Sequence, residues 1–195
     1  MERVFQNSDG TAFLAKGIFA NKELLEKCIA YAKPLLEKRP EIIVYGKKCK
    51  QPRNVGFFSN ESIGYNYSRQ LMKSQPLGPE LAELLKSVNE LLGANFNGIL
   101  ANEYENGEST IGAHSDSETG LDSKVGVVSI SYGAERKFRI RDKTDKKIVC
   151  EEPTTHCGLL VMGGANFQKL YTHEIPVQKK IKESRLSFTF RKHTY

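Results

Sequence analysis

The sequence lacks the features that would direct a chain into or through a membrane. Its 195 residues contain no apolar run near the roughly 20 residues that a helix needs to cross a bilayer. The segment Met1–Phe5 has no basic stretch followed by an apolar one, which is the layout of a secretory signal. We therefore expect an intracellular protein, in the nucleus or the cytoplasm, that has no membrane partner.

Close cysteine pairs of the C-x-x-C kind are also absent, although the chain has four cysteines. Such pairs are typical of zinc sites and redox centres. In a reducing compartment we expect the four to be free thiols. Cys150, His156 and Cys157 lie near one another in the chain, but a fourth zinc ligand is not evident, so the sequence disfavours a zinc site there.

Basic residues outnumber acidic ones, 29 to 23, which gives a net charge of +6 and a pI near 9.1. Such an excess favours a partner that carries phosphates. One segment concentrates both basic and aromatic side chains: Lys47, Lys48, Lys50 and Arg53 beside Tyr45, Phe57, Phe58, Tyr65 and Tyr67. This mixture suits the phosphates and bases of a nucleic acid. It fits equally well a solvated loop whose aromatic side chains pack in the core.

Two helices are predicted in the first half of the chain. The first covers 21–38, where Asn21 is a suitable N-cap and Pro34 should kink or end the helix. The second covers 79–92 and should end at Gly93, because glycine readily adopts the left-handed conformation of a helix end.

The second half predicts strands. Short runs rich in Val, Ile, Phe and Tyr occur at 97–104, 125–132, 136–141, 146–151, 158–163 and 185–191. Helices followed by many strands predict an α+β fold ending in a β-sandwich or jelly roll. The length suits one domain, 1–195, with a β-rich lid at 42–75 and a jelly-roll core at 96–192.

The candidate metal ligands are His114, Asp116 and His173. In an extended segment His114 and Asp116 share one face, and His173 follows a later strand. Two histidines and one carboxylate form the facial triad of non-haem iron(II) oxygenases. The pair His114–Asp116 by itself also fits a surface turn.

The strand 185–191 has an unusual polar face. Its side chains alternate, with Leu186, Phe188 and Phe190 on one face and Arg185, Ser187, Thr189 and Arg191 on the other. Two arginines on one face of a core strand need an anionic partner, and a dicarboxylate such as 2-oxoglutarate suits them. Asn102 and Tyr104 share a face of strand 97–104 and would complete such a pocket. The alternative is a sheet edge with its arginines in solvent.

These motifs resemble the AlkB family of nucleic-acid demethylases from about residue 42 to residue 192. The matching stretches are Asn102–Tyr104, His114–Glu118, Ser129–Phe138, Gly158–Met162, His173 and Arg185–Arg191. The resemblance implies a double-stranded β-helix (jelly-roll) fold. It implies a dioxygenase that uses Fe(II), 2-oxoglutarate and O2 to remove N-alkyl groups from adenine or cytosine, releasing formaldehyde, succinate and CO2.

The resemblance also assigns roles in the co-substrate pocket. It implies that Arg185 and Tyr104 hold the distal carboxylate of 2-oxoglutarate, with Asn102 and Arg191 near the metal-proximal end. The family usually has asparagine where this chain has Ser187, and the shorter hydroxyl is expected to loosen the pocket.

Base recognition is implied for four further residues. Tyr65 and Tyr67 would stack on a flipped base, and Glu118 would contact its exocyclic amine. Tyr45 would fill the gap in an opened duplex, while Arg53 and the neighbouring lysines grip phosphates. Ordinary packing or a surface turn remains the alternative for each aromatic residue and for Glu118.

The expected partner is therefore alkylated DNA, RNA or both, bound by a monomer. The alternative function is a 2-oxoglutarate-dependent hydroxylase of protein side chains or of a small molecule. It would keep the same iron site but would have no use for the basic-aromatic lid.

Overall fold

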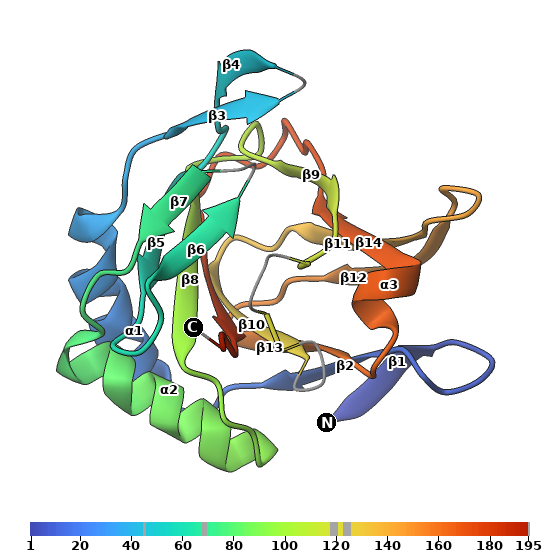
Figure 1. The fold of residues 1–195 in the computed structure, drawn as a ribbon, viewed down its shortest axis with the longest axis horizontal. Coiled ribbons are helices and arrows are strands. Elements are labelled where there is room, and N and C mark those ends of the chain that lie inside the picture. Colours follow the sequence, from blue (N-terminus) through green and yellow to red (C-terminus); the bar gives the residue numbers. More distant parts are fainter. Residues whose placement is uncertain (45, 68–69, 118–120, 123–125, 195) are drawn as a thin grey trace.

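The computed structural model of the protein describes residues 1–44, 46–67, 70–117, 121–122 and 126–194. Two antiparallel β-sheets face each other and form the centre of the molecule (Figure 1). The seven-stranded sheet has the order β1 (Glu2–Gln6), β2 (Phe13–Ile18), β13 (Gly158–Gly163), β10 (Val127–Gly133), β15 (Arg185–Arg191), β8 (Gly98–Tyr104) and β5 (Asn54–Phe58). The four-stranded sheet has the order β12 (Ile148–Pro153), β11 (Lys137–Asp142), β14 (Tyr171–Ile175) and β9 (Ile111–His114). The α+β jelly roll predicted from the sequence is confirmed.

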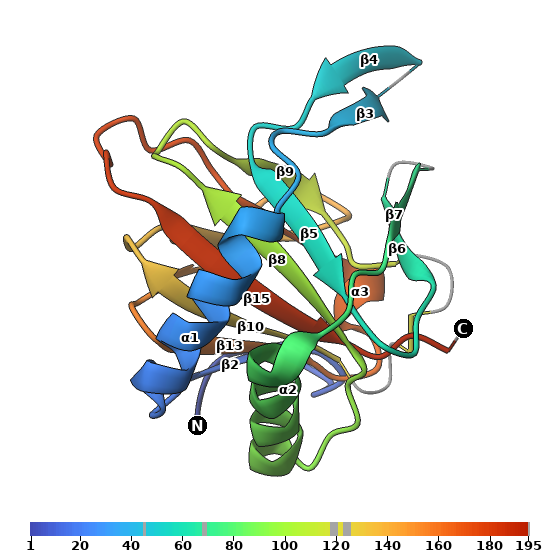
Figure 2. The ribbon, with the colours of Figure 1, turned by 90° about the vertical axis from the view of Figure 1, so that its left-hand side faces the viewer.

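Helices α1 (Lys22–Ala32) and α2 (Gly78–Leu92) cover the outer face of the large sheet (Figure 2). Asn21 caps α1, since its Oδ1 accepts a hydrogen bond from the Leu24 backbone at 3.0 Å. The predicted helix 21–38 is shorter than expected: a 3₁₀ turn over Lys33–Leu35 follows α1, because Pro34 cannot continue the helical hydrogen bonding. Gly93 ends α2 with φ of 60°, as predicted.

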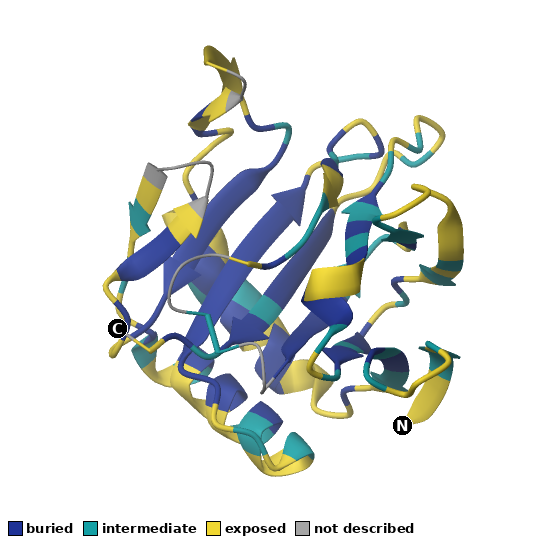
Figure 3. Cartoon of the chain, turned by 45° about the vertical axis from the view of Figure 1, so that its right-hand side comes forward, coloured by how far each residue is buried: buried dark blue, intermediate teal, exposed yellow. Residues whose placement is uncertain are grey.

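The central strands of the large sheet are buried almost throughout (Figure 3), because side chains pack on both faces of the sheet. Leu186, Phe188 and Phe190 pack under the helices together with buried side chains of α1 and α2. On the other face, apolar side chains of both sheets meet, among them Phe138 and Ile175 of the small sheet. The polar face of β15 therefore looks into the space between the sheets. Because β15 lies between β10 and β8, it is a central strand, and its arginines do not lie at a sheet edge.

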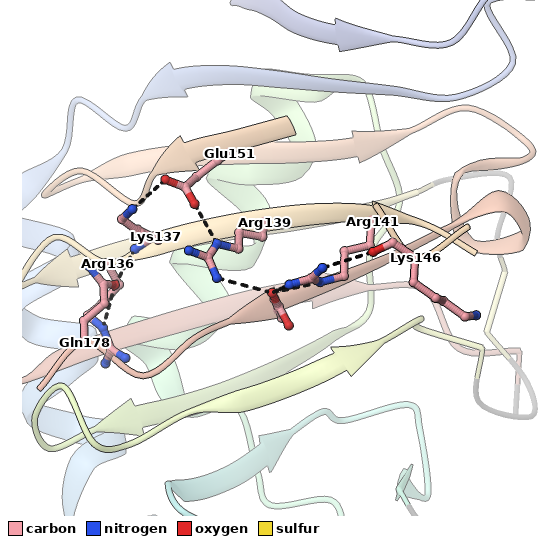
Figure 4. A network of polar contacts seen from close by, with 8 residues as sticks. Arg136, Lys137, Arg139, Arg141, Lys146, Glu151 and Gln178 are labelled. Atoms are coloured by element: carbon pink, nitrogen blue, oxygen red, sulfur yellow. Dashed lines mark hydrogen bonds and ion pairs between the residues drawn. The ribbon is translucent and has the colours of Figure 1, made fainter. Parts of the chain in front are cut away.

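Ion pairs on the outer face of the small sheet connect its strands (Figure 4). Arg139 Nε donates to Glu151 Oε2 of β12 at 2.6 Å, and Arg141 Nη2 donates to Glu174 Oε1 of β14 at 2.9 Å. Isolated surface pairs contribute little to stability, but this series joins β11 to both of its neighbours, β12 and β14. β14 carries His173, which lies opposite Ile140 of β11.

Two hairpins extend from one end of the sheets (Figure 2). They are β3 (Glu41–Val44) with β4 (Lys47–Lys50), and β6 (Gly64–Tyr67) with β7 (Gln70–Lys73). Between them in the chain, β5 joins the large sheet beside β8, so the segment 42–75 is partly a lid and partly sheet. A short helix, α3 (Phe167–Leu170), precedes β14. No helix in the described ranges is long and apolar enough to span a membrane.

Candidate metal centre and co-substrate pocket

Strand pairing brings the two histidines together. His114 is the last residue of β9, and its cross-strand neighbour in β14 is His173. Directly paired positions of an antiparallel sheet point to the same face. The two imidazole rings accordingly lie with their centroids 4.3 Å apart, and the Phe138 ring stacks on His173 at 5.5 Å.

Asp116 completes the group just after β9. Its Oδ1 lies 3.9 Å from His114 Nε2 and its Oδ2 lies 3.6 Å from His173 Nε2. One potential ligand atom from each residue falls within 4.8 Å of the others. Among the described residues, no other group of three or more His, Cys, Asp or Glu side chains could hold a metal ion. Cys150, His156 and Cys157 therefore do not form a zinc site.

The hydrogen bonds around the triad fit a metal ion. His114 Nδ1 lies 2.8 Å from the Gly112 carbonyl oxygen, which can only accept, so Nδ1 carries the proton and Nε2 offers its lone pair. Asp116 Oδ2 and His173 Nδ1 are buried and have no hydrogen-bond partner among the described residues. A buried acceptor without a partner is unfavourable, and a metal ion bound at Oδ2 would relieve this.

Burial sets the charge of the ligands. Desolvation lowers the pKa of His173 to about 3, and the pKa of His114 is lowered for the same reason. Burial by itself would raise the pKa of Asp116, but the charge of the Arg191 guanidinium, and those of the two imidazoles when they are protonated at low pH, outweigh it and lower that pKa to about 2. At neutral pH the site thus presents two neutral imidazoles and one carboxylate, which are the protonation states that metal binding requires.

The polar face of β15 forms the rest of the same cavity. Arg185 pairs with Tyr104 of β8, and Ser187 pairs with Asn102. These four residues and Arg191 line one cavity of about 50 Å³ together with the metal triad. The sequence placed all five in one pocket, and the structure brings them together.

Arg185 is the side chain best suited to hold an anion. It is 3% exposed, and its guanidinium lies over the Tyr104 ring at 5.0 Å. Nη2 donates to Ser131 Oγ at 2.8 Å, whereas Nε and Nη1 have no hydrogen-bond partner among the described residues. Burial lowers the pKa of Arg185, but an arginine stays protonated in proteins. A buried cation with unused donors fits a carboxylate ligand.

Arg191 lies at the metal end of the cavity. Its Nη2 donates to Asp116 Oδ1 at 3.1 Å, and its guanidinium lies over the Tyr65 ring at 4.8 Å. The arginine therefore orients the carboxylate ligand and leaves Asp116 Oδ2 directed to His173.

Comparison with known families agrees with this geometry. Residues 11–191 match the 2OG-Fe(II) oxygenase superfamily. The chain belongs to this superfamily. Fe(II) and 2-oxoglutarate, which the sequence predicted, are the metal and the co-substrate in the superfamily's name.

The relatives of this oxygenase include AlkB homologues. DNA oxidative demethylase ALKBH2 of Homo sapiens is 31% identical over 175 residues, and the match covers 86% of this chain and 66% of that protein. ALKBH2 of Mus musculus is 30% identical, and the match covers 86% of this chain and 72% of that protein. The human alpha-ketoglutarate-dependent dioxygenase alkB homolog 3 is 33% identical over 151 residues, with 73% and 52% covered.

The chain thus spans 66% of the human ALKBH2 and 62% of the bovine ALKBH2. A solved structure titled "The structure of OsALKBH1" has the same fold, with a TM-score of 0.59 at 16% identity, covering 92% of this chain and 97% of that one. The resemblance to the AlkB family is confirmed.

Of the four residues expected to contact the base, only Tyr65 has a side chain that the structure describes. Tyr65 is buried in the cavity wall and stacks on Phe57 at 6.0 Å. Tyr67 lies in β6, but its side chain is not among those described, and Tyr45 and Glu118 lie outside the described residues. Their roles stay predictions.

Arg53 was expected to grip phosphates together with the neighbouring lysines, but it lies in a different environment from them. It is 4% exposed, and its Nε donates to Asn102 Oδ1 at 2.8 Å, whereas Lys47, Lys48 and Lys50 are exposed on β4. A guanidinium buried in this way orients a pocket residue and does not lie on the surface with the lysines.

Three supporting residues escaped the sequence analysis. Ser131 accepts from Arg185, and Gln168 Oε1 accepts from the Asp116 backbone at 2.9 Å. Arg136, 1% exposed, donates to carbonyl oxygens of the segments 106–109 and 176 and to Gln178 (Figure 4). The position of Ser131 could have been predicted, because it lies two residues after Ser129 and so on the same face of the strand.

Proposed function

We propose that this oxygenase removes N-alkyl groups from adenine or cytosine bases of nucleic acid in a reaction that depends on Fe(II) and 2-oxoglutarate. The observation that carries the proposal is one cavity that holds both the His114, Asp116 and His173 triad and the buried cation Arg185 with two unused nitrogens. The relatives named as DNA oxidative demethylases support the substrate class.

Each side chain has a distinct task. His114, Asp116 and His173 would hold Fe(II), which supplies oxidation by O2 coupled to decarboxylation of 2-oxoglutarate. Arg185, beside the Tyr104 ring, would bind the distal carboxylate of the co-substrate. Arg191 keeps Asp116 ionised and oriented.

The base has to enter this cavity from outside. A base in a duplex cannot reach a buried site unless it is flipped out, so a single strand or an opened duplex is the substrate. Tyr65 in the cavity wall offers an aromatic ring beside the metal end. The exposed lysines Lys47, Lys48 and Lys50 would contact the phosphates. The named side chains come from one chain, so a monomer suffices.

The test is incubation with Fe(II), 2-oxoglutarate and a panel of methylated single- and double-stranded DNA and RNA, followed by mass spectrometry of the bases. The wild type should restore unmodified bases and form succinate in step with them. Asp116→Asn is the matched control, because it removes the ligand charge yet keeps an acceptor for Arg191. Succinate formed with a peptide library, and with none of the nucleic acids, would overturn the proposal in favour of a protein hydroxylase.

A further inference from the structure

A second cavity lies beside the metal cavity, between the two hairpins. It has a volume of about 390 Å³, within the roughly 300–1,000 Å³ that is common for ligand sites. Its walls come from the segment 37–42, from β5 and from the hairpin β6–β7, and they include Tyr65. Tyr65 also lines the metal cavity, so one phenol side chain stands between the two spaces.

Gln51 lines this cavity, and its side-chain oxygen has no hydrogen-bond partner among the described residues. Gln51 is 4% exposed, and its Oε1 is buried without a hydrogen bond to any described residue. Its backbone is well held, since Gln51 N donates to Pro40 O at 2.9 Å and Gln51 O accepts from Arg39 Nε at 3.4 Å. An unpaired amide in a buried position costs free energy unless a ligand completes its hydrogen bonds.

The remaining walls favour a flat, neutral group that carries an amine. Ile42, Val55 and Met72 provide apolar surface, and Glu37 and Glu41 add carboxylates that are not ion-paired with any described residue. Carboxylates at a cavity repel phosphate and accept hydrogen bonds from amines. A carboxamide can pair in a bidentate manner with N6 and N7 of adenine.

We propose that this cavity binds the nucleobase adjacent to the target base in the same strand, and that it prefers adenine. The proposal rests on the function proposed above. With the target base in the metal cavity, the next nucleotide lies on the other side of Tyr65, and its base enters the second cavity. The exposed lysines of β4, among them Lys50 opposite Glu41 of β3, would contact the strand's phosphates. The enzyme thus reads sequence next to the lesion.

The experiment uses short single-stranded oligonucleotides that carry one N-methylated base and differ only in the neighbouring base. For the wild type, KM should be about tenfold lower with adenine than with thymine beside the lesion, since one bidentate base contact discriminates by roughly this factor. Gln51→Leu should abolish the difference while kcat stays unchanged. Gln6→Leu, on β1 at the opposite edge of the large sheet from β5, should keep it.

Two further measurements separate the possible failures. Thermal unfolding should show Gln51→Leu at least as stable as the wild type, because the buried oxygen that it removes has no partner among the described residues. Met72→Trp should weaken binding next to every base by filling the cavity. Binding of unmodified adenine-rich and thymine-rich oligonucleotides is measured in parallel by fluorescence anisotropy. If no oligonucleotide is demethylated, the proposed function fails. The ratio of the affinities for adenine-rich and thymine-rich oligonucleotides, and its loss in Gln51→Leu, then still test whether the cavity binds adenine. Equal values for all neighbouring bases, or a preference that survives Gln51→Leu, overturn the inference.

Discussion

Replacing Arg185 by methionine tests the co-substrate pocket most directly. Methionine fills much of the same space, and it removes the only charge that faces Tyr104 from β15. In the wild type one guanidinium nitrogen is used by Ser131 and two are without a partner. We therefore expect the Arg185 guanidinium to contribute more to the binding of a ligand than to the stability of the fold.

The size of the effect follows from these contacts. A hydrogen bond to a charged group contributes about 1.5–3 kcal/mol, so the loss of one should raise the Kd for 2-oxoglutarate about 10- to 150-fold. At a concentration about 100 times the wild-type Kd, the co-substrate stabilises the wild type by about 2.7 kcal/mol. At the same concentration a variant with a 100-fold higher Kd gains only about 0.4 kcal/mol.

Thermal unfolding with and without 2-oxoglutarate measures this difference. For a chain of this length about 2.7 kcal/mol corresponds to a rise in Tm of about 5–10 °C, against about 1 °C for Arg185→Met. Arg139→Met, the same change on the outer face of the small sheet, should retain the wild-type rise. An unchanged rise in Arg185→Met would refute the assignment, and a large fall in Tm without co-substrate would show that Arg185 is structural.

Three further outcomes are expected. Asp116→Asn should abolish binding of a divalent metal in equilibrium dialysis, while His156→Ala, which lies outside the metal cavity, should bind as the wild type does. Ser187→Asn should be tolerated and should tighten 2-oxoglutarate binding in calorimetry, since an amide reaches further into the cavity than a hydroxyl; weaker binding would show that it obstructs the site. Iodoacetamide at neutral pH should modify the exposed Cys49 and spare Cys28, whose thiol has a pKa raised by burial to about 12, as peptide mass spectrometry would show.

Periodicity predicted β15 well because apolar and polar side chains alternate along it, although both of its faces are buried. The predicted strands 158–163 and 185–191 agree with β13 and β15 at both ends. The same alternation placed Arg185 and Arg191 on one face, and the central position of β15 turns that face into the cavity. A pattern with period two therefore predicted chemistry as well as secondary structure.

The strands that carry the histidines were not among those predicted. β9 has four residues and includes Gly112, and β14 has five and follows directly after α3, so neither presents a long alternating run. In β14 the buried positions Tyr171, His173 and Ile175 do alternate, and this was the available signal. Motif spacing located His173 where strand propensity did not.

Burial of single charges could not be predicted from local sequence. Arg53 stands among lysines in the chain, yet it pairs with Asn102, which is 49 residues away. Arg136 likewise binds carbonyl oxygens of two distant segments. Such partners exist only once the chain has folded, because no local pattern distinguishes a buried guanidinium from an exposed one.

The buried charges around the cavity explain why metal and co-substrate belong together. Arg185 and Arg191 contribute two positive charges, and Asp116 contributes one negative charge, while the imidazoles are neutral. A ferrous ion would add further positive charge among side chains that are mostly buried, where charges interact strongly. A dianion such as 2-oxoglutarate offsets this excess. Each ligand therefore strengthens the binding of the other, and by linkage the effect must be equal in both directions.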